Sequence, residues 1–303
     1  MSIRGVFSAA ATPLNTDLSP DHGALAAHCR QLLDDGCHGV AMLGSTGEAN
    51  SFSADERRAM LEAVVRSGIS PDQLMPGTGL SALPETVALT RHALSLGVTK
   101  VVMLPPFYYK GVSDQGLFVA YSQVIDAIAD DRLRVVLYHI PPISQIPLSH
   151  ELIARLCERY PNTIAGVKDS GGQLEHMASL AKTFPQLAIL AGADPFLLPL
   201  MQAGGSGCIT ATSNLAARQL RVVFDKHADP AATAEVEAAQ RRIIALREAS
   251  NSFAQIPTIK AMIARRNDAP GWRRMRAPLV ALTDAQADQL ATILEGVDQS
   301  HPA

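Results

Sequence analysis

The chain has 303 residues, of which 47% are hydrophobic and only 5% aromatic, and its formal net charge is −3. This length suits one α/β barrel with a modest extension, whose interior is filled by small and branched aliphatic side chains. Such a charge gives no electrostatic attraction to nucleic acid or to a membrane surface, so we expect neither as a partner.

The four cysteines form no Cys-x-x-Cys pair and show no ligand spacing with histidine. We therefore expect reduced thiols in a cytoplasmic protein. The apolar stretch Gly5–Ala11 follows Arg4 but ends before Pro13, and a first strand explains it better than a signal peptide. No window reaches the ~18 apolar residues of a membrane span.

Short apolar or β-branched runs alternate with longer segments of helical periodicity along most of the chain. The runs predicted as strands are Val6–Ala11, Gly39–Leu43, Leu74–Thr78, Lys100–Leu104, Arg134–His139, Ile164–Lys168, Ala188–Ala191 and Gly207–Ala211. Helical patterns between them cover His22–Asp34, Asp55–Ser67, Glu85–Leu96, Gln115–Ala129 and Leu148–Tyr160. This alternation predicts a parallel sheet, and eight units favour a (β/α)8 barrel over the alternative, a doubly wound sheet.

Two helix starts can be recognised from their capping residues. Ser53 and Glu56 have the spacing of a capping box, and Ser19-Pro20 fits an N-cap followed by proline at the first helical position. After Ala211 the strand patterns stop, and three more helices are predicted: Ala231–Ala249, Pro257–Arg266 and Asp284–Leu294. We expect a catalytic barrel over residues 1–225 and a C-terminal helical layer packed on it over residues 226–303.

The predicted second strand leads into Gly44-Ser45-Thr46-Gly47-Glu48. Two glycines around two hydroxyl groups, ahead of a capped helix, suit a pocket of backbone N–H groups that holds a small anion such as a carboxylate. An ordinary turn between strand and helix is the alternative. In a barrel of this kind the residues that do chemistry lie at the carboxyl ends of strands, which is where this segment falls.

The predicted fifth strand ends at Tyr138, whose phenol could carry a proton. Strand alternation directs the next residue, His139, to the other face, so we expect His139 to be structural. The sixth strand closes on Lys168, although lysine is among the residues least often buried. Burial should depress the pKa of this amine from ~10.4, and a neutral amine can attack a ketone. A lysine paired with Asp169 or with a helix terminus is the alternative.

With these motifs in place, the chain resembles the dihydrodipicolinate synthase / N-acetylneuraminate lyase family from about Gly5 to Leu294. The motifs that carry the resemblance are Gly44–Glu48, Tyr138 followed by Pro141, Gly166-Val167-Lys168-Asp169, and Gly205-Ser206-Gly207-Cys208-Ile209. In this order and on these strands, they are a specific signal.

The resemblance implies that Lys168 forms a Schiff base with a 2-oxo acid, usually pyruvate, without metal or cofactor. It implies a proton relay that contains Thr46 and Tyr138. The carboxylate would lie against Ser45, Thr46 and Gly47, and Gly192 and Ile209 match positions whose backbone lines the same pocket. It also implies a homotetramer in which a tyrosine enters the neighbouring subunit's site, and Tyr108 in the Pro106–Tyr109 segment is the better candidate.

One departure bears on the substrate. Dihydrodipicolinate synthases carry an arginine two residues after the Tyr-x-x-Pro motif, whereas this chain has Ile143 there, flanked by Ser144 and Gln145. The missing bidentate anchor argues against the synthase reaction. The segment Gly166-Val167-Lys168-Asp169-Ser170-Gly171-Gly172 resembles that of the aldolases that cleave 4-hydroxy-2-oxo or 2-keto-3-deoxy acids, with pyruvate and an aldehyde as the fragments. The alternatives are a dihydrodipicolinate synthase proper, a keto-deoxy sugar acid dehydratase, and a catalytically silent sensor of 2-oxo acids.

Overall fold

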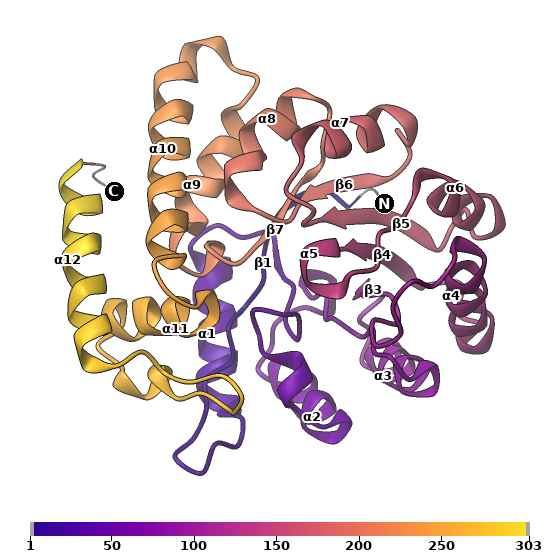
Figure 1. Cartoon of the computed structure of the whole chain (residues 1–303), viewed down its shortest axis with the longest axis horizontal. Coiled ribbons are helices and arrows are strands. Elements are labelled where there is room, and N and C mark those ends of the chain that lie inside the picture. The colour runs from indigo at the N-terminus through magenta and orange to yellow at the C-terminus, as the bar shows by residue number, and fades with distance from the viewer. Residues whose placement is uncertain (1–2, 301–303) are drawn as a thin grey trace.

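The computed structural model describes residues 3–300 as a curled parallel sheet surrounded by helices (Figure 1). The strands are β1 (Gly5–Ser8), β2 (Gly39–Val40), β3 (Lys100–Met103), β4 (Arg134–His139), β5 (Ile164–Asp169), β6 (Ala188–Ala191) and β7 (Gly207–Thr210). Their order in the seven-stranded sheet is β2-β1-β7-β6-β5-β4-β3, and each neighbouring pair is parallel. The α/β architecture predicted from the alternation of elements is therefore confirmed.

The prediction of a regular strand over Leu74–Thr78 is wrong. This segment makes only isolated parallel bridges, from Leu74 to β2 and from Gly77 to β3, so it lies between the two ends of the sheet. Hydrogen bonds from Met75 N to Val40 O and from Thr78 N to Val102 O hold it on both sides. Regular pairing is interrupted because Pro76 has no N–H to donate.

Helices follow most strands and cover the outside of the sheet (Figure 1). The first group is α1 (His22–Asp34), α2 (Ala54–Arg66), α3 (Leu83–Ser95), α4 (Asp114–Ile128), α5 (Pro141–Ser144) and α6 (His150–Arg159). The second is α7 (Leu174–Thr183), α8 (Leu197–Gln202), α9 (Ser213–Lys226), α10 (Thr233–Ser250), α11 (Gln255–Arg266) and α12 (Asp284–Ser300). Every helical pattern recognised in the sequence is a helix here, with ends that differ by a few residues.

The capping predictions had different outcomes. Ser53 begins α2 with a complete capping box, as predicted. The Ser19-Pro20 prediction is wrong, because the Ser19 hydroxyl donates to Asp17 and Asp21 caps α1 by accepting from Ala24 N at 2.9 Å. An aspartate two residues later is as good an N-cap as serine, so local preference alone could not choose between them.

Alternation along the strands separates two apolar cores. One face of the sheet encloses an inner cluster that includes Phe7, Val136, Tyr138, Leu190 and Ile209, while a larger outer cluster lies beneath the helices. Because Tyr138 lies two residues after Val136, its side chain points to the same interior. The carboxyl ends of β4 and β5 thus direct side chains into one central space.

The last three helices lie together beside the sheet (Figure 1). Helix α10 packs on α9, and α12 packs on α10. Helix α11 also contacts α9 and α10, which brings the start of α11 close to the end of α10. Within residues 3–300, no helix combines the length and the apolar character needed to cross a membrane.

Candidate active site

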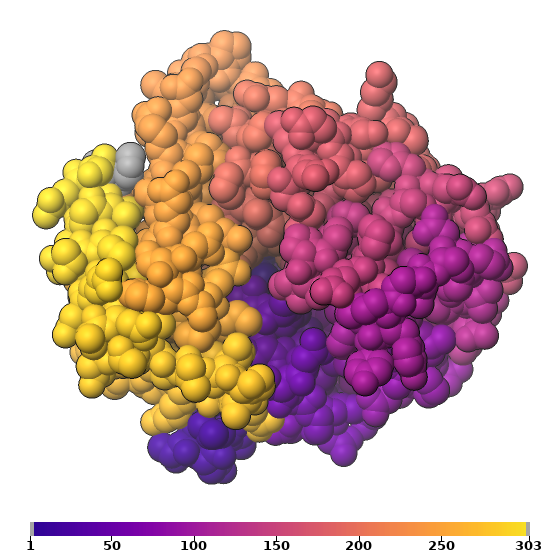
Figure 2. Space-filling model, in the orientation of Figure 1, coloured from indigo at the N-terminus to yellow at the C-terminus, as the bar shows by residue number. Residues whose placement is uncertain are grey.

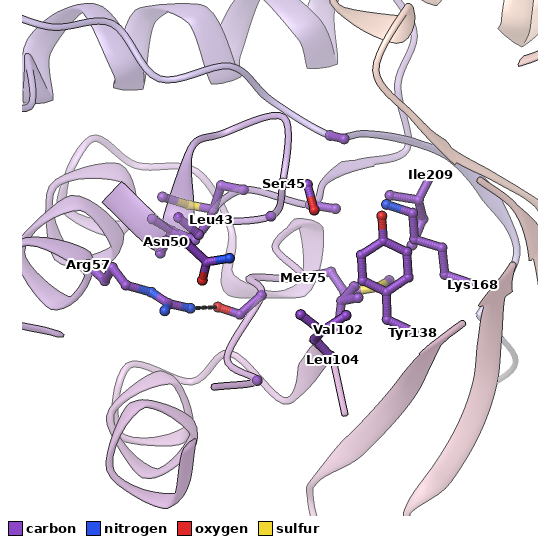
Figure 3. A pocket seen from close by; sticks show the side chains of 17 residues that line it. Leu43, Ser45, Asn50, Arg57, Met75, Val102, Leu104, Tyr138, Lys168 and Ile209 are labelled. Atoms are coloured by element: carbon purple, nitrogen blue, oxygen red, sulfur yellow. Dashed lines mark hydrogen bonds between the residues drawn. The ribbon is translucent and has the colours of Figure 1, made fainter. Parts of the chain in front are cut away.

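Lys168 lies at the centre of the candidate site. It is only 7% exposed, and the sheet register pairs it with Tyr138 on the adjacent strand. Its Nζ lies 4.2 Å from the centroid of the Tyr138 ring, and Figure 3 shows the amine beside the phenol. The alternative in which Lys168 pairs with Asp169 is wrong, because Asp169 points to the other face and bonds His176 Nδ1 at 2.6 Å.

The Tyr138 phenol is surrounded by polar groups. Burial alone raises its pKa, but the nearby Lys168 amine, together with hydrogen bonds from Ser170, Lys168 and Ser45, holds the pKa below its usual value. A phenol stabilised in this way is better able to give up and take back a proton. The hydroxyl of the Gly44–Glu48 segment that contributes is that of Ser45; Thr46 lines the wider cavity.

Two connected hollows meet at these side chains. An inner one of about 490 Å³ extends between the strands, and an outer one of about 1330 Å³ opens toward the C-terminal helices. Ser45, Tyr138, Lys168 and Ile209 line both. Figure 2 shows the surface hollowed between the C-terminal helices, in orange, and the segment around α5, in magenta. Lys168 and Tyr138 are thus reached from the outer hollow.

Glycines allow the backbone to approach closely around this space. A Cβ on Gly47 would lie 2.8 Å from Ala10 O, and one on Gly192 would lie 1.9 Å from Ser170 Oγ. Gly192 N also donates to Asp169 O at 2.7 Å, which fixes the chain after β6 against the end of β5. Of the residues predicted for the pocket, Ser45, Thr46, Gly192 and Ile209 line the outer hollow, and Gly47 shapes the turn beside it.

The Gly44–Glu48 segment is fixed from the opposite end of the chain. Glu48 has a left-handed backbone, with φ of 57°, and its carboxylate lies 2.6 Å from Lys260 Nζ on α11. Both side chains are fully buried, and burial lowers the pKa of Lys260 while Glu48 opposes that effect. This ion pair connects the predicted anion-binding turn to the C-terminal helices, and no local pattern indicates that the two residues meet.

His139 occupies the outer face of β4, as strand alternation predicts. One nitrogen of His139, one of His176 and one oxygen of Asp169 lie within 4.8 Å of one another, a spacing that could suit a metal ion. However, His139 Nδ1 accepts a hydrogen bond from Leu148 N at 3.1 Å, so the neutral ring carries its proton on Nε2. That protonated nitrogen has no free lone pair for a metal, so the three side chains are better described as a polar cluster in which His176 bonds Asp169 and stacks on His139.

Other residues singled out in the sequence lie around the site. Tyr108 is 72% exposed, and it lines neither hollow within this chain. Ile143 lines the outer hollow, where it contributes apolar surface. Ser144 does not face the cavity, because its hydroxyl bonds to Ile140 O and Ile146 N within the turn.

Sequence reasoning gave no role to several polar residues of the outer hollow, which are Ser170, Arg247, Glu248, Asn251 and Gln255. Ser170 lies beside Tyr138, and its position directly after Lys168-Asp169 was the available signal. Arg247, on α10, lines the outer hollow opposite the strand ends, and no local motif distinguishes it from its neighbours on the same helix. Lys168 and Arg247 are the two cationic side chains in the lining of this hollow.

Comparisons with known proteins agree with this geometry. Residues 2–297 match the model of the dihydrodipicolinate synthetase family. An uncharacterized DapA-like lyase of Chloroflexus aurantiacus is 35% identical over 97% of each chain. The crystal structure of dihydrodipicolinate synthase from Agrobacterium tumefaciens superposes with a TM-score of 0.89 at 31% identity, covering 99% of both chains. The prophage protein YagE of E. coli K12, solved in complex with pyruvate, gives 0.90 at 25% identity, over 97% of this chain and 98% of that one.

Proposed function

Because this chain belongs to the dihydrodipicolinate synthetase family, we propose that it is a class I aldolase in which Lys168 forms a Schiff base with pyruvate. The observation that carries the proposal is the arrangement of Lys168 and Tyr138. Lys168 Nζ lies 4.2 Å from the centroid of the Tyr138 ring, at the ends of neighbouring strands. Ser45 and Thr46 also line the cavity that contains them. A buried amine that contacts a phenol of lowered pKa suits imine chemistry.

The proposed reaction begins with attack of the Lys168 amine on the ketone carbon of a 4-hydroxy-2-oxo acid. Loss of water gives an imine, whose protonated nitrogen accepts the electron pair when the bond between C3 and C4 breaks. Tyr138 takes the proton of the C4 hydroxyl as the aldehyde leaves, and the resulting enamine is protonated and hydrolysed to pyruvate and free lysine. The reverse sequence condenses pyruvate with an aldehyde.

The 2-oxo acid's carboxylate is proposed to lie against Ser45, Thr46 and Gly47. Backbone N–H groups and hydroxyls of such a turn can hold an anion without a charged side chain. Gly192 and Ile209 would complete the pocket, and Thr46 would join Tyr138 in the relay. Ile143 supports an aldolase of hydroxylated or sugar-derived acids over a synthase, because it provides no charge at the position of the synthases' arginine.

The proposal also covers the closure of the barrel, the oligomeric state and the cellular location of the protein. We propose a closed (β/α)8 barrel over residues 1–225, a helical layer over residues 226–303, and a cytoplasmic homotetramer. The isolated bridges of the 74–78 segment to β2 and β3 support closure of the sheet. The exposed side chain of Tyr108 supports a role in a neighbouring subunit's site. Cys29, Cys37, Cys157 and Cys208 are free thiols, which suits a reducing compartment.

Borohydride trapping tests the central claim. Incubation with pyruvate and borohydride should add a reduced pyruvyl group, which peptide mapping should locate on Lys168. Lys168→Ala should lose the label, whereas Lys182→Ala on α7 is the matched control and should keep it. Labelling that survives in Lys168→Ala would overturn the proposal. A screen of aldehydes with pyruvate, with products identified by mass spectrometry, then separates aldol chemistry from loss of water by a dehydratase.

A further inference from the structure

We infer that Arg247 recognises an anionic group at the far end of the substrate, the end that leaves as the aldehyde. This inference rests on the proposed aldolase function and adds a substrate class to it. The lining of the outer hollow includes two cationic side chains from different elements, Lys168 at the end of β5 and Arg247 on α10. Since the proposed chemistry occurs at Lys168, the second cation is available for a group further along the substrate.

The guanidinium of Arg247 is held in place by its neighbours. With the Gln255 amide in the orientation that satisfies its hydrogen bonds, its oxygen accepts from Arg247 Nη1 at 2.6 Å and from Nη2 at 3.1 Å. Gln255 and Asn251 line the same hollow, so the polar cluster is part of the cavity wall. Because a guanidinium has five N–H donors, two bonds to one amide leave donors for a ligand.

Arg247 also forms a long ion pair with the carboxylate of Asp194. The distance from Arg247 Nη1 to Asp194 Oδ2 is 3.8 Å, which is too long for a hydrogen bond. Asp194 is fully buried, and burial raises its pKa despite the opposing effect of Arg247. Asp194 therefore steers the guanidinium without occupying its donors, and the Arg247 side chain remains 21% exposed toward the hollow.

The two ends of the substrate would thus be recognised by different means. Near Lys168, the Gly44–Glu48 turn offers hydroxyls and backbone N–H groups to the 2-oxo acid's own carboxylate. At the other end, Ile143 is apolar, and Arg247 and Glu248 of α10 both line the hollow, so Arg247 is the cation there and must take the ligand's anion beside a carboxylate. A planar guanidinium suits carboxylate and phosphate oxygens. The expected substrates are 4-hydroxy-2-oxo acids with a second anionic group at the opposite end of the chain.

The test compares three aldehydes of the same carbon length with pyruvate as partner. Glyceraldehyde ends in an alcohol, tartronate semialdehyde in a carboxylate, and glyceraldehyde 3-phosphate in a phosphate. The parent protein should have the highest kcat/KM with one of the two anionic aldehydes, and their comparison decides between carboxylate and phosphate. Arg247→Gln should lower kcat/KM for that aldehyde about 10- to 100-fold and leave glyceraldehyde little changed.

Arg241→Gln is the matched control, because Arg241 lies on the same helix with its side chain 58% exposed and 3.7 Å from Glu237. It should alter none of the three reactions. Equal losses on all three aldehydes in Arg247→Gln would mean that Arg247 only compensates Asp194, and would overturn the inference. A parent that prefers glyceraldehyde would also overturn it, and this comparison decides the matter if Arg247→Gln fails to fold. Pyruvate trapping on Lys168 in the parent separates failure of this inference from failure of the aldolase proposal.

Discussion

The buried ion pair between Glu48 and Lys260 should be necessary both for stability and for the geometry of the carboxylate pocket. The two residues are 212 positions apart in the chain, are fully buried, and meet at 2.6 Å. In the described structure Glu48 Oε2 has no hydrogen-bond partner, so Lys260 is the main compensation for this carboxylate. Lys260→Met keeps the volume of the side chain but leaves the carboxylate alone in the interior.

Removing one partner of a buried ion pair costs about 3–5 kcal/mol of folding stability, because the remaining charge has lost its water and gained nothing in exchange. We expect a loss of this size in the free energy of unfolding of Lys260→Met, measured by urea titration at neutral pH. The loss should shrink at acidic pH, because a lone buried carboxylate can become neutral by taking up a proton. The pyruvate concentration needed for half-maximal trapping should rise, since Ser45 and Thr46 belong to the turn that Glu48 anchors.

The double variant Glu48→Gln with Lys260→Met is the control, because it removes both charges together. It should be more stable than Lys260→Met alone, since neither partner remains charged and unpaired. A Lys260→Met protein that loses less than about 1 kcal/mol, the scale of an exposed pair, would refute the reasoning. So would a double variant that is less stable than the single one.

Four further predictions follow from single residues. Tyr138→Phe should lower kcat ~10²–10⁴-fold in steady-state assays and leave pyruvate trapping affinity nearly intact, because it removes a proton carrier but keeps the ring; a change of only a few-fold would contradict the relay. If Tyr108 completes a neighbour's site, sedimentation should find activity only in oligomers, and an active monomer would exclude that role. Condensation with aspartate semialdehyde should be at least ~10-fold less efficient in kcat/KM than with the preferred aldehyde, because Ile143 provides no charge at the position of the synthases' arginine and Arg247 lies on a different element; if it proves the best substrate, the protein is a synthase. Burial lowers the pKa of His28 to about 4 from 6.5, so the unfolded chain binds the extra proton and stability should fall as the pH drops through this window. Between pH 6.5 and about 4, the free energy of unfolding of the parent should fall by about 3 kcal/mol more than that of His28→Gln, as measured by urea titration at each pH. Parallel curves of stability against pH would contradict the assignment.

Much of the candidate site could be predicted from short stretches of sequence. A lysine that ends an apolar strand is informative on its own, because burial penalises its charge. Such a position therefore points to a site that uses the amine. Strand alternation correctly separated Tyr138 from His139, since successive side chains point to opposite faces. The capping box at Ser53 was equally local, as its two hydrogen bonds join residues three positions apart.

Local patterns were less decisive where two signals competed or where one residue broke a pattern. Ser19 and Asp21 are both good N-caps, and packing of α1 selected the second. The apolar run at 74–78 reads as a strand, but Pro76 removes a donor and leaves only isolated bridges.

Only the tertiary structure could decide which distant side chains share the cavity. The register that places Tyr138 beside Lys168 depends on pairing between strands, and the Glu48–Lys260 contact depends on how α11 packs against the end of the sheet. Arg247 looks like any other arginine of an amphipathic helix until the packing of α10 turns it toward the site. Sequence periodicity determines which face of an element is buried, but the position of that element relative to others is set by packing across the whole chain.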